Sequence, residues 1–246
     1  MRRYAVIGFP VEQSRSPELY LPLFRKHGIN ADFVCRTVLP GDIPDIRLIT
    51  EDLSGFAVTM PHKRAIIPYL DEIDDTASAC GAVNIVERRG DKLIGHNTDG
   101  EGLADAILAL GVSVSGMTAA MLGRGGAAVS AAYALAKRGA SVTLLVRSPS
   151  ESPAFPEVSP SAVLSHFDIF INASPVGMKG REDFWELTFL DIMRPKLVCD
   201  MVYRNDGDTS LISGAKARGI PAVDGHEMLK RQGLRAFGIW TGIRPE

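Results

Sequence analysis

The stretch 117–148 constrains the fold of this chain more than any other part of the sequence. It reads MTAAMLGRGGAAVSAAYALAKRGASVTLLVRS, in which an apolar run leads through a glycine loop into a helical segment, Gly139 and a second apolar run. This order predicts a strand, a helix that ends at Gly139, and a second strand, which together form the βαβ unit of a parallel sheet. The unit places this part of the chain in the α/β class.

The glycine loop matches the G-x-G-x-x-A pattern of a dinucleotide site through Gly123, Gly125 and Ala128. Gly123 permits the tight turn, Gly125 lets a pyrophosphate approach the backbone, and Ala128 lets the helix pack closely on the sheet. Free N–H groups at the start of the helix would bind the phosphates. The alternative is a strand-to-helix turn that needs glycine only for its geometry.

The end of the second strand indicates which dinucleotide binds. An acidic residue there would contact the ribose 2′-OH of NAD, but this strand ends LLVRS, without Asp or Glu. A guanidinium can pair with a 2′-phosphate, so Arg147 and Ser148 predict NADP. The alternative is an exposed arginine at a strand end that binds nothing.

Strand-like and helix-like segments alternate along the rest of the chain, which extends the α/β prediction to all of it. Before the βαβ unit we expect strands at 4–9, 32–38 and 55–59, a hairpin at 82–99 that turns at Gly90 and Asp91, and helices at 17–28 and 100–111. After it we expect strands at 167–174 and 196–203 and helices at 209–219 and 226–242. Four prolines in 148–161 predict a loose connector.

We expect two domains, divided near Asn97 and Thr98, where the hairpin ends and a connecting helix begins. The first would comprise residues 1–98, with 226–246 packing back on it. The second would be a Rossmann-type dinucleotide-binding domain over residues 99–225.

Charge and composition exclude several classes of partner. The net charge of −2 argues against nucleic acid and acidic membranes, and no apolar run is long enough to span a membrane. The apolar run in the opening MRRYAVIGFP is too short for a signal peptide and predicts a strand. Cys35, Cys80 and Cys199 are far apart, form no CxxC pair and fit a reducing cytoplasm. The five histidines lack metal-binding spacing, so no metal is expected.

Several polar residues are expected at one edge of the first sheet. Lys63 follows the strand GFAVT, Asp99 and Asn84 flank the hairpin strands, and Ser14 and Ser16 follow the first strand. Ligands of open α/β sheets bind beyond the carboxyl ends of the strands, so these residues predict a cleft. The alternatives are a structural ion pair between Lys63 and Asp99, helix capping by Asp99, and capping by the serines of the helix that begins at Pro17.

These residues lie in motifs whose set and order resemble the shikimate dehydrogenase family. The motifs, which cover almost the whole chain, are YAVIGFPVEQSRSP, GFAVTMPHK, GAVNIV, HNTDG, GRGGAA, INASPVGM, CDMVY and DGHEMLKRQGLRAFGIWTG. The resemblance implies a two-domain α/β enzyme with an N-terminal substrate domain, a Rossmann-type NADP-binding domain and a C-terminal helix that returns to the first domain. It also implies reversible hydride transfer between NADPH and 3-dehydroshikimate, giving shikimate.

The resemblance further implies a role for each site residue. Lys63 and Asp99 would form the catalytic pair, with Lys63 as general acid–base and Asp99 mainly orienting Lys63 and the substrate hydroxyl. Substrate contacts would come from Ser14 and Ser16 at the carboxylate, Asn84 at the ring hydroxyls, and Thr59, Lys63, Asp99, Tyr203 and Gln232. Cofactor contacts would come from Gly123, Arg124, Gly125, Gly126 and Ala127 at the phosphates, Arg147 and Ser148 at the adenosine phosphate, and Met201, Gly225 and Met228 at the nicotinamide.

The sequence departs from the family pattern mainly around the adenosine phosphate. Val146 replaces the usual asparagine, a second basic residue after Arg147 is absent, and Arg124 stands in GRGG where the family has GAGG. DGHEML replaces the more apolar DGLGML, which is expected to affect closure over the nicotinamide. The family usually continues beyond WTGIRPE with another helix, so stability or oligomeric state, as a monomer or homodimer, is expected to differ. The alternatives are therefore a relative that prefers quinate and NAD, or a non-catalytic ligand-binding relative, against which the intact Lys63, Asp99, Asn84 and Gln232 argue.

Overall fold

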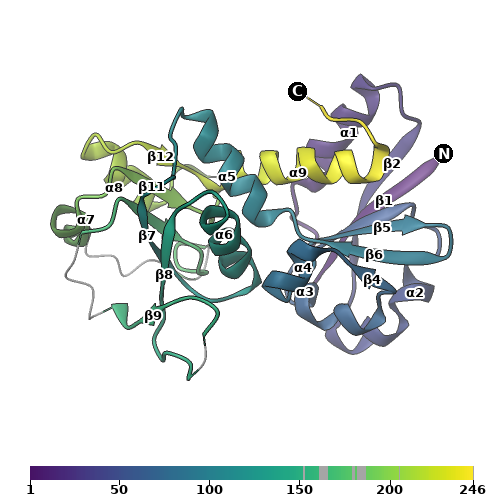
Figure 1. Ribbon diagram of the computed structural model, residues 1–246. Helices are drawn as coiled ribbons and strands as arrows, with labels where there is room; N and C mark the ends of the chain where they lie inside the picture. Colours follow the sequence, from purple (N-terminus) through teal and green to yellow (C-terminus); the bar gives the residue numbers. More distant parts are fainter. Residues whose placement is uncertain (152, 161–165, 179–180, 182–186, 205, 246) are drawn as a thin grey trace. The chain divides into compact units, whose positions relative to one another are not determined.

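The structure is a computed structural model that describes residues 1–151, 153–160, 166–178, 181, 187–204 and 206–245. The chain forms two compact units. Unit 1 comprises Met1–Asp99 and Gln232–Glu246, and unit 2 comprises Gly100–Arg231. Figure 1 labels the elements of both.

Unit 1 is built on a mixed sheet with the strand order β2-β1-β3-β5-β6-β4. Its strands are β1 (Arg2–Gly8), β2 (Ala31–Thr37), β3 (Gly55–Val58), β4 (Glu72–Ile73), β5 (Ile85–Arg89) and β6 (Lys92–His96). β1 pairs in parallel with β2 and β3, whereas β5 runs antiparallel to both β3 and β6. The carboxyl ends of β1, β3 and β6 and the amino end of β5 therefore share one edge of this sheet.

Helices pack on both faces of the sheet of unit 1. They are α1 (Ser16–Lys26), α2 (Ile46–Ile49), α3 (His62–Ala65), α4 (Asp75–Cys80), the 3₁₀ turns Pro40–Asp45 and Ile67–Tyr69, and the last part of α9 (Gly225–Thr241). One face of β1 contributes Tyr4 and Val6 to a core with Tyr20 of α1 and Phe237 and Trp240 of α9. The Trp240 indole Nε1 donates to the Val86 carbonyl at 3.0 Å, which ties the end of α9 to β5. The expected return of the C-terminal helix to the first domain is confirmed.

Unit 2 contains an all-parallel sheet in the order β12-β11-β10-β7-β8-β9. Its strands are β7 (Thr118–Leu122), β8 (Ser141–Leu145), β9 (Glu157–Val158), β10 (Ile169–Asn172), β11 (Leu197–Asp200) and β12 (Ala222–Val223). The chain runs outward from β7 to β8 and β9, and then back to β10 on the other side of β7. This reversal creates a topological switch point between β7 and β10, where open α/β sheets bind ligands.

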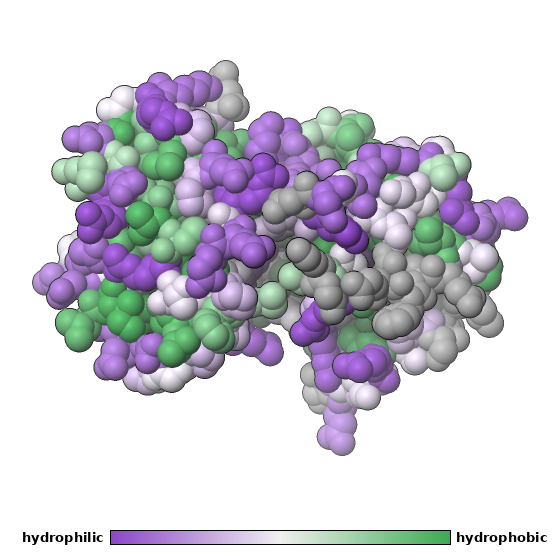
Figure 2. Space-filling view, turned by 180° about the vertical axis from the view of Figure 1, so that it is seen from behind, coloured by the Kyte–Doolittle hydropathy of each residue, from purple (hydrophilic) through white to green (hydrophobic). Residues whose placement is uncertain are grey.

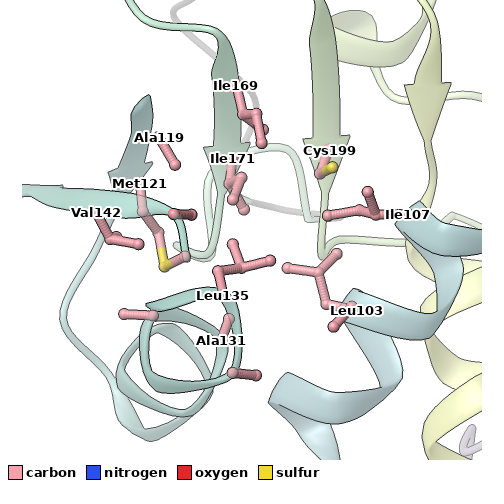
Figure 3. Packing of buried hydrophobic residues seen from close by; sticks show 14 of the residues in the cluster. Leu103, Ile107, Ala119, Met121, Ala131, Leu135, Val142, Ile169, Ile171 and Cys199 are labelled. Carbon is pink, nitrogen blue, oxygen red and sulfur yellow. The ribbon is translucent and has the colours of Figure 1, made fainter. Parts of the chain in front are cut away.

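Helices cover both faces of the sheet of unit 2, which makes it a doubly wound α/β unit. Its helices are α5 (Asp99–Ala109, of which Asp99 belongs to unit 1), α6 (Gly126–Ala136), α7 (Thr188–Met193), α8 (Ser210–Ala217) and the first turns of α9. Figure 3 shows Leu103 and Ile107 of α5 and Leu135 of α6 packed beside Ile171 and Cys199 of the sheet. On the opposite face, α7 and α8 pack against β10 and β11.

The local turn predictions are confirmed, but the connector prediction is wrong in part. The hairpin turns at Gly90 and Asp91, with Arg89 paired to Lys92 and Gly90 at a φ of 61°. Within the proline-rich segment, Glu157 and Val158 form β9 and extend the sheet beside β8. A two-residue strand at a sheet edge leaves no periodic pattern for sequence analysis to detect.

The hydropathy of one face and of the helices in the described part of the chain bears on membrane contact. On the face seen in Figure 2, hydrophilic residues predominate and apolar residues form small groups between them. Among the described residues, no helix combines the length and apolar character that crossing a bilayer requires.

Candidate active site and cofactor loop

Lys63 and Asp99 form an ion pair in unit 1. Lys63 Nζ donates to Asp99 Oδ2 at 2.6 Å, and the two side chains are 24% and 7% exposed. Lys63 lies in α3, just beyond the carboxyl end of β3, and its backbone carbonyl accepts the Val83 N–H. The pair therefore joins the ends of β3 and β6, which lie on either side of β5, and the Lys63 side chain is more exposed than the Asp99 side chain.

A buried amide and hydroxyl network surrounds the Asp99 carboxylate. Asn84 Nδ2 donates to Asp99 Oδ1 at 2.8 Å and lies 3.3 Å from Gln232 Oε1. The Thr98 hydroxyl lies 3.0 Å from Asn84 Nδ2 and 3.2 Å from Gln232 Oε1, while the Thr98 N–H donates to Asn84 Oδ1 at 2.9 Å. Sequence analysis missed Thr98, whose signal was its place beside Asp99 in HNTDG.

The start of α5 leaves the Asp99 carboxylate free to face Lys63. The Asp99 N–H donates to the side-chain oxygen of Asn97 at 3.0 Å, and Asn97 is itself held by the Ala82 carbonyl at 2.8 Å. Asp99 is the first residue of α5, and both carboxylate oxygens bond to side chains. The Asp99 carboxylate is thus engaged by side chains and does not cap α5 as expected, while the Asn97 side chain accepts the Asp99 N–H at the start of the helix.

The remaining predicted substrate residues of unit 1 lie beyond β1 and β3. Ser14 Oγ accepts the Ser16 N–H at 3.3 Å and lies 3.1 Å from Ser16 Oγ, so the two serines contact each other at the start of α1. Thr59 is half-buried, and its carbonyl accepts the His62 N–H. His62 is buried, and its Nε2 lies 2.6 Å from the Val38 carbonyl. Its side chain therefore has a different partner from the side chain of Lys63, which pairs with Asp99.

Tyr20 lies in the core beneath this network. Its hydroxyl is buried and has no hydrogen-bond partner in the described part of the chain. Burial, followed by the charge of Asp99, raises the pKa of Tyr20 well above its usual value, so the phenol stays protonated. Tyr20 is a core aromatic that stacks on Phe33, with ring centroids 4.6 Å apart.

The glycine loop of unit 2 is shaped to admit a phosphate. Gly123 has a φ of 110°, and an added Cβ would lie 2.9 Å from the Ala173 carbonyl oxygen at the end of β10. An added Cβ at Gly125 would meet only open space. Gly125 is the N-cap of α6 and has no side chain to occupy the free N–H groups, and Gly126 and Ala127 form the first turn. The loop therefore has an open cradle at the β7–β10 switch point, which fits a dinucleotide pyrophosphate.

The end of β8 separates an exposed arginine from a buried valine. Arg147 and Ser148 are exposed, and Arg147 has no hydrogen bond or ion pair with the described residues. Val146, where the family has asparagine, is 6% exposed and packs in the core of unit 2. Arg124 extends from the glycine loop and donates to the Ser148 carbonyl at 3.0 Å.

The residues predicted at the nicotinamide lie together near the end of β11. Met228 is 7% exposed in the core of unit 2, and Met201 packs against the same cluster. A Cβ at Gly225 would lie 2.6 Å from the Val202 carbonyl oxygen, so only glycine allows α9 to begin this close to the strand end. Tyr203, also in unit 2, is partly exposed, and its ring centroid is 5.2 Å from that of His226.

A second buried polar network, which sequence analysis missed, supports the β10 and β11 ends. Asp200 Oδ1 accepts from Asn172 Nδ2 at 2.9 Å and from the Val202 N–H at 3.0 Å, and Oδ2 accepts from the Thr209 hydroxyl at 2.6 Å. These bonds fix the backbone that carries Met201. Among the described residues, no group of three His, Cys, Asp or Glu side chains is arranged to hold a metal.

Comparisons with known proteins agree with this architecture. The family described as "Shikimate dehydrogenase substrate binding domain" matches residues 6–86. A curated shikimate dehydrogenase (NADP(+)) from Aquifex aeolicus is 35% identical over 249 residues, covering 97% of this chain and 91% of that protein.

Two solved structures show the same fold over nearly the whole chain. Shikimate 5-dehydrogenase from Thermus thermophilus, solved with NADP(H) and shikimate, has a TM-score of 0.89 and 29% identity, covering 100% of this chain and 95% of that one. The enzyme from Listeria monocytogenes, solved with shikimate and NAD, has a TM-score of 0.83 and 27% identity, covering 99% and 93%. The sequence identity and its near-complete coverage establish that the chain belongs to the shikimate dehydrogenase family.

Proposed function

We propose that this protein is an NADP-dependent shikimate dehydrogenase that interconverts 3-dehydroshikimate and shikimate. Family membership supports the reaction class. The observation that carries the proposal is the 2.6 Å Lys63–Asp99 pair, held at a strand-end edge among Asn84, Thr98 and Gln232. A carboxylate, two amides and a hydroxyl beside an accessible amine suit a small polyhydroxylated ring.

The chain supplies the proton chemistry of the reaction. Bound NADP would supply hydride acceptance or donation. The Lys63 side chain is 24% exposed, so its amine can take a proton from the alcohol oxygen or return it to the carbonyl oxygen. Asp99, whose Oδ2 accepts from Lys63 Nζ at 2.6 Å, orients the amine.

The other polar residues bind and orient the substrate. The Asn84 and Gln232 side chains share the Thr98 hydroxyl, so their amide groups are fixed before substrate binds. We assign the substrate carboxylate to Ser14 and Ser16, further contacts to Thr59 and Tyr203, and the nicotinamide contacts to Met201, Gly225 and Met228.

The glycine loop fits NADP, and its residues would hold the cofactor phosphates. The open space at Gly125 and the uncapped N–H groups of α6 suit the pyrophosphate, and Arg147 suits the 2′-phosphate. The proposal includes a substrate domain over 1–98 with 226–246, a cofactor domain over 99–225, and a cytoplasmic monomer or homodimer acting on a small molecule.

A dehydrogenase that prefers NAD or quinate is the second candidate, for a specific reason. The family has asparagine at position 146, and this chain has a buried valine there. The adenosine phosphate therefore finds no side-chain amide at this position. A related structure was solved with NAD, which supports this alternative.

Turnover of purified protein with each substrate and cofactor pair tests the proposal. We expect NADP reduction with shikimate to exceed reduction with quinate or with NAD. Lys63→Ala should lower kcat by about 100- to 10,000-fold, while calorimetry still detects shikimate binding. Lys92→Ala, an exposed lysine paired with Glu72 in the same unit, is the control and should keep full activity. Near-normal turnover in Lys63→Ala would exclude the role of Lys63, and absence of turnover with every pair would exclude the enzyme.

A further inference from the structure

Arg124 is anchored to the segment that follows β8. Its Nη1 donates to the Ser148 carbonyl at 3.0 Å and to the Ser150 hydroxyl at 2.6 Å, and lies 3.4 Å from Glu157 Oε2. Ser148 directly follows Arg147. Arg124, which stands where the family's GAGG pattern has alanine, therefore connects the glycine loop to the segment after β8.

Glu157 is a nearly buried carboxylate at the centre of this junction. Its side chain is 5% exposed, against 49% for Arg124. Glu157 Oε2 also accepts the Ser150 N–H at 2.6 Å, and the residue is fixed by the pairing of β9 with Leu144 of β8. Glu157 thus holds both the 148–150 segment and the Arg124 guanidinium in place.

The anchoring of Arg124 leaves most of its guanidinium available. All three contacts are made by Nη1, while Nη2 and Nε make no hydrogen bond with the described residues. A guanidinium has five N–H donors in a planar fork, and the Nη2–Nε edge can bind two oxygens of one phosphate. Because Arg124 is half exposed, this edge can reach a ligand.

We propose that Arg124 is the second cation of the site for the 2′-phosphate of NADP, and that Glu157 is its anchor and counter-ion. The inference rests on the proposed NADP dependence. The chain has no basic residue shortly after Arg147, and Arg124 supplies that charge from the glycine loop instead. A phosphomonoester carries a charge of about −1.5 to −2 at pH 7, which the two arginines balance.

Glu157 sets how strongly the site favours the phosphate. Its negative charge offsets one of the two arginines, and its Oε2 occupies the Ser150 N–H, a potential phosphate donor. Removing the charge should therefore raise affinity for a 2′-phosphate, because the Ser148 carbonyl and the Ser150 hydroxyl still hold Arg124.

Calorimetric titration with adenosine 2′,5′-bisphosphate and with 5′-AMP isolates the 2′-phosphate from the reaction. In the full-length protein, Arg124→Gln should weaken bisphosphate binding by about tenfold, the low end for a charged hydrogen bond at a half-exposed site. Its effect on 5′-AMP should stay within about twofold, because 5′-AMP lacks the 2′-phosphate. Glu157→Gln should tighten bisphosphate binding by about threefold. Arg218→Gln, which breaks an ion pair with Asp191 elsewhere in unit 2, is the control and should change neither affinity.

Each contrary result overturns the proposal. An unchanged bisphosphate affinity in Arg124→Gln means that Arg124 does not bind the 2′-phosphate, and an equal loss for both nucleotides means that it only supports the loop. Weaker bisphosphate binding in Glu157→Gln refutes the counter-ion role. Because the titration needs no shikimate, failed turnover with intact Arg124-dependent binding would refute only the proposed function.

Discussion

Thr98→Val tests whether the hydroxyl that links Asn84 and Gln232 prepares the substrate site. Valine keeps the shape of threonine but removes the hydroxyl, which lies 3.0 Å from Asn84 Nδ2 and 3.2 Å from Gln232 Oε1. The Thr98 N–H still donates to Asn84 Oδ1, so the backbone of the hairpin end should stay in place. The substitution therefore affects the orientation of two side chains and little else.

The expected size of the effect follows from the bonds that remain. Asn84 keeps its 2.8 Å bond to Asp99, and the 3.3 Å approach of its amide to Gln232 also remains. The loss is that of one neutral buried hydrogen bond, about 1 kcal/mol. If this energy organises the site for substrate, the shikimate dissociation constant should rise by about fivefold.

Steady-state kinetics and calorimetry with shikimate measure this change. We expect KM for shikimate to rise with little change in kcat, and the affinity for NADP to stay the same, because the glycine loop lies in the other unit. Thr98→Ser keeps the hydroxyl and should behave like the unchanged protein. Equal effects of valine and serine would show that the methyl group, not the hydroxyl, matters, and an unchanged KM in Thr98→Val would refute the role of the network.

Two further predictions concern unit 2. Gly125→Ala adds a Cβ in open space, so it should lower the unfolding free energy by about 1 kcal/mol or less while weakening nucleotide binding. Gly123→Ala adds a Cβ at a φ of 110° and 2.9 Å from the Ala173 oxygen, so it should lower the unfolding free energy by about 1–3 kcal/mol. Urea unfolding measures both losses, and equal losses would contradict the open cradle. Hydrogen bonds from Thr118 hold the pKa of Asp168 well below its usual range, so its stabilisation is complete above the unfolded-state pKa of about 3.9 and is lost as pH falls below it. Asp168→Asn should therefore flatten the acid-side decline of the unfolding free energy, and a decline as steep as that of the unchanged protein would refute the assignment.

The elements that sequence analysis predicted are those whose cause is local. The βαβ unit follows from the spacing of Gly123, Gly125 and Ala128, and Gly123 indeed needs a positive φ. The hairpin turn follows from Gly90, also at a positive φ. α3 and β9 were missed because four and two residues are too few to show a period. Their formation depends on tertiary pairing, such as that of Glu157 with Leu144.

The site residues likewise divide into those that sequence motifs indicate and those whose importance depends on tertiary neighbours. Lys63, Asp99, Asn84 and Gln232 were identified through motifs, and the structure brings their side chains into one network; their roles remain predictions. Thr98 was missed because a threonine at a hairpin end is ordinary in sequence, and its value lies in the neighbours that it joins. The attachment of Arg124 to Ser148, Ser150 and Glu157 depends on the path of a segment whose four prolines gave no periodic signal.

The topology explains why residues so far apart in the chain meet at one edge of unit 1. β3, β5 and β6 are neighbours in the sheet, so the end of β3, the start of β5 and the end of β6 bring Lys63, Asn84 and Asp99 together. Gln232 comes from α9, and its position depends on how that helix is fixed to the sheet. The Trp240 bond to the Val86 carbonyl provides this attachment two turns further along. The polar network is therefore held by the hydrophobic packing of the C-terminal helix as well as by its own hydrogen bonds.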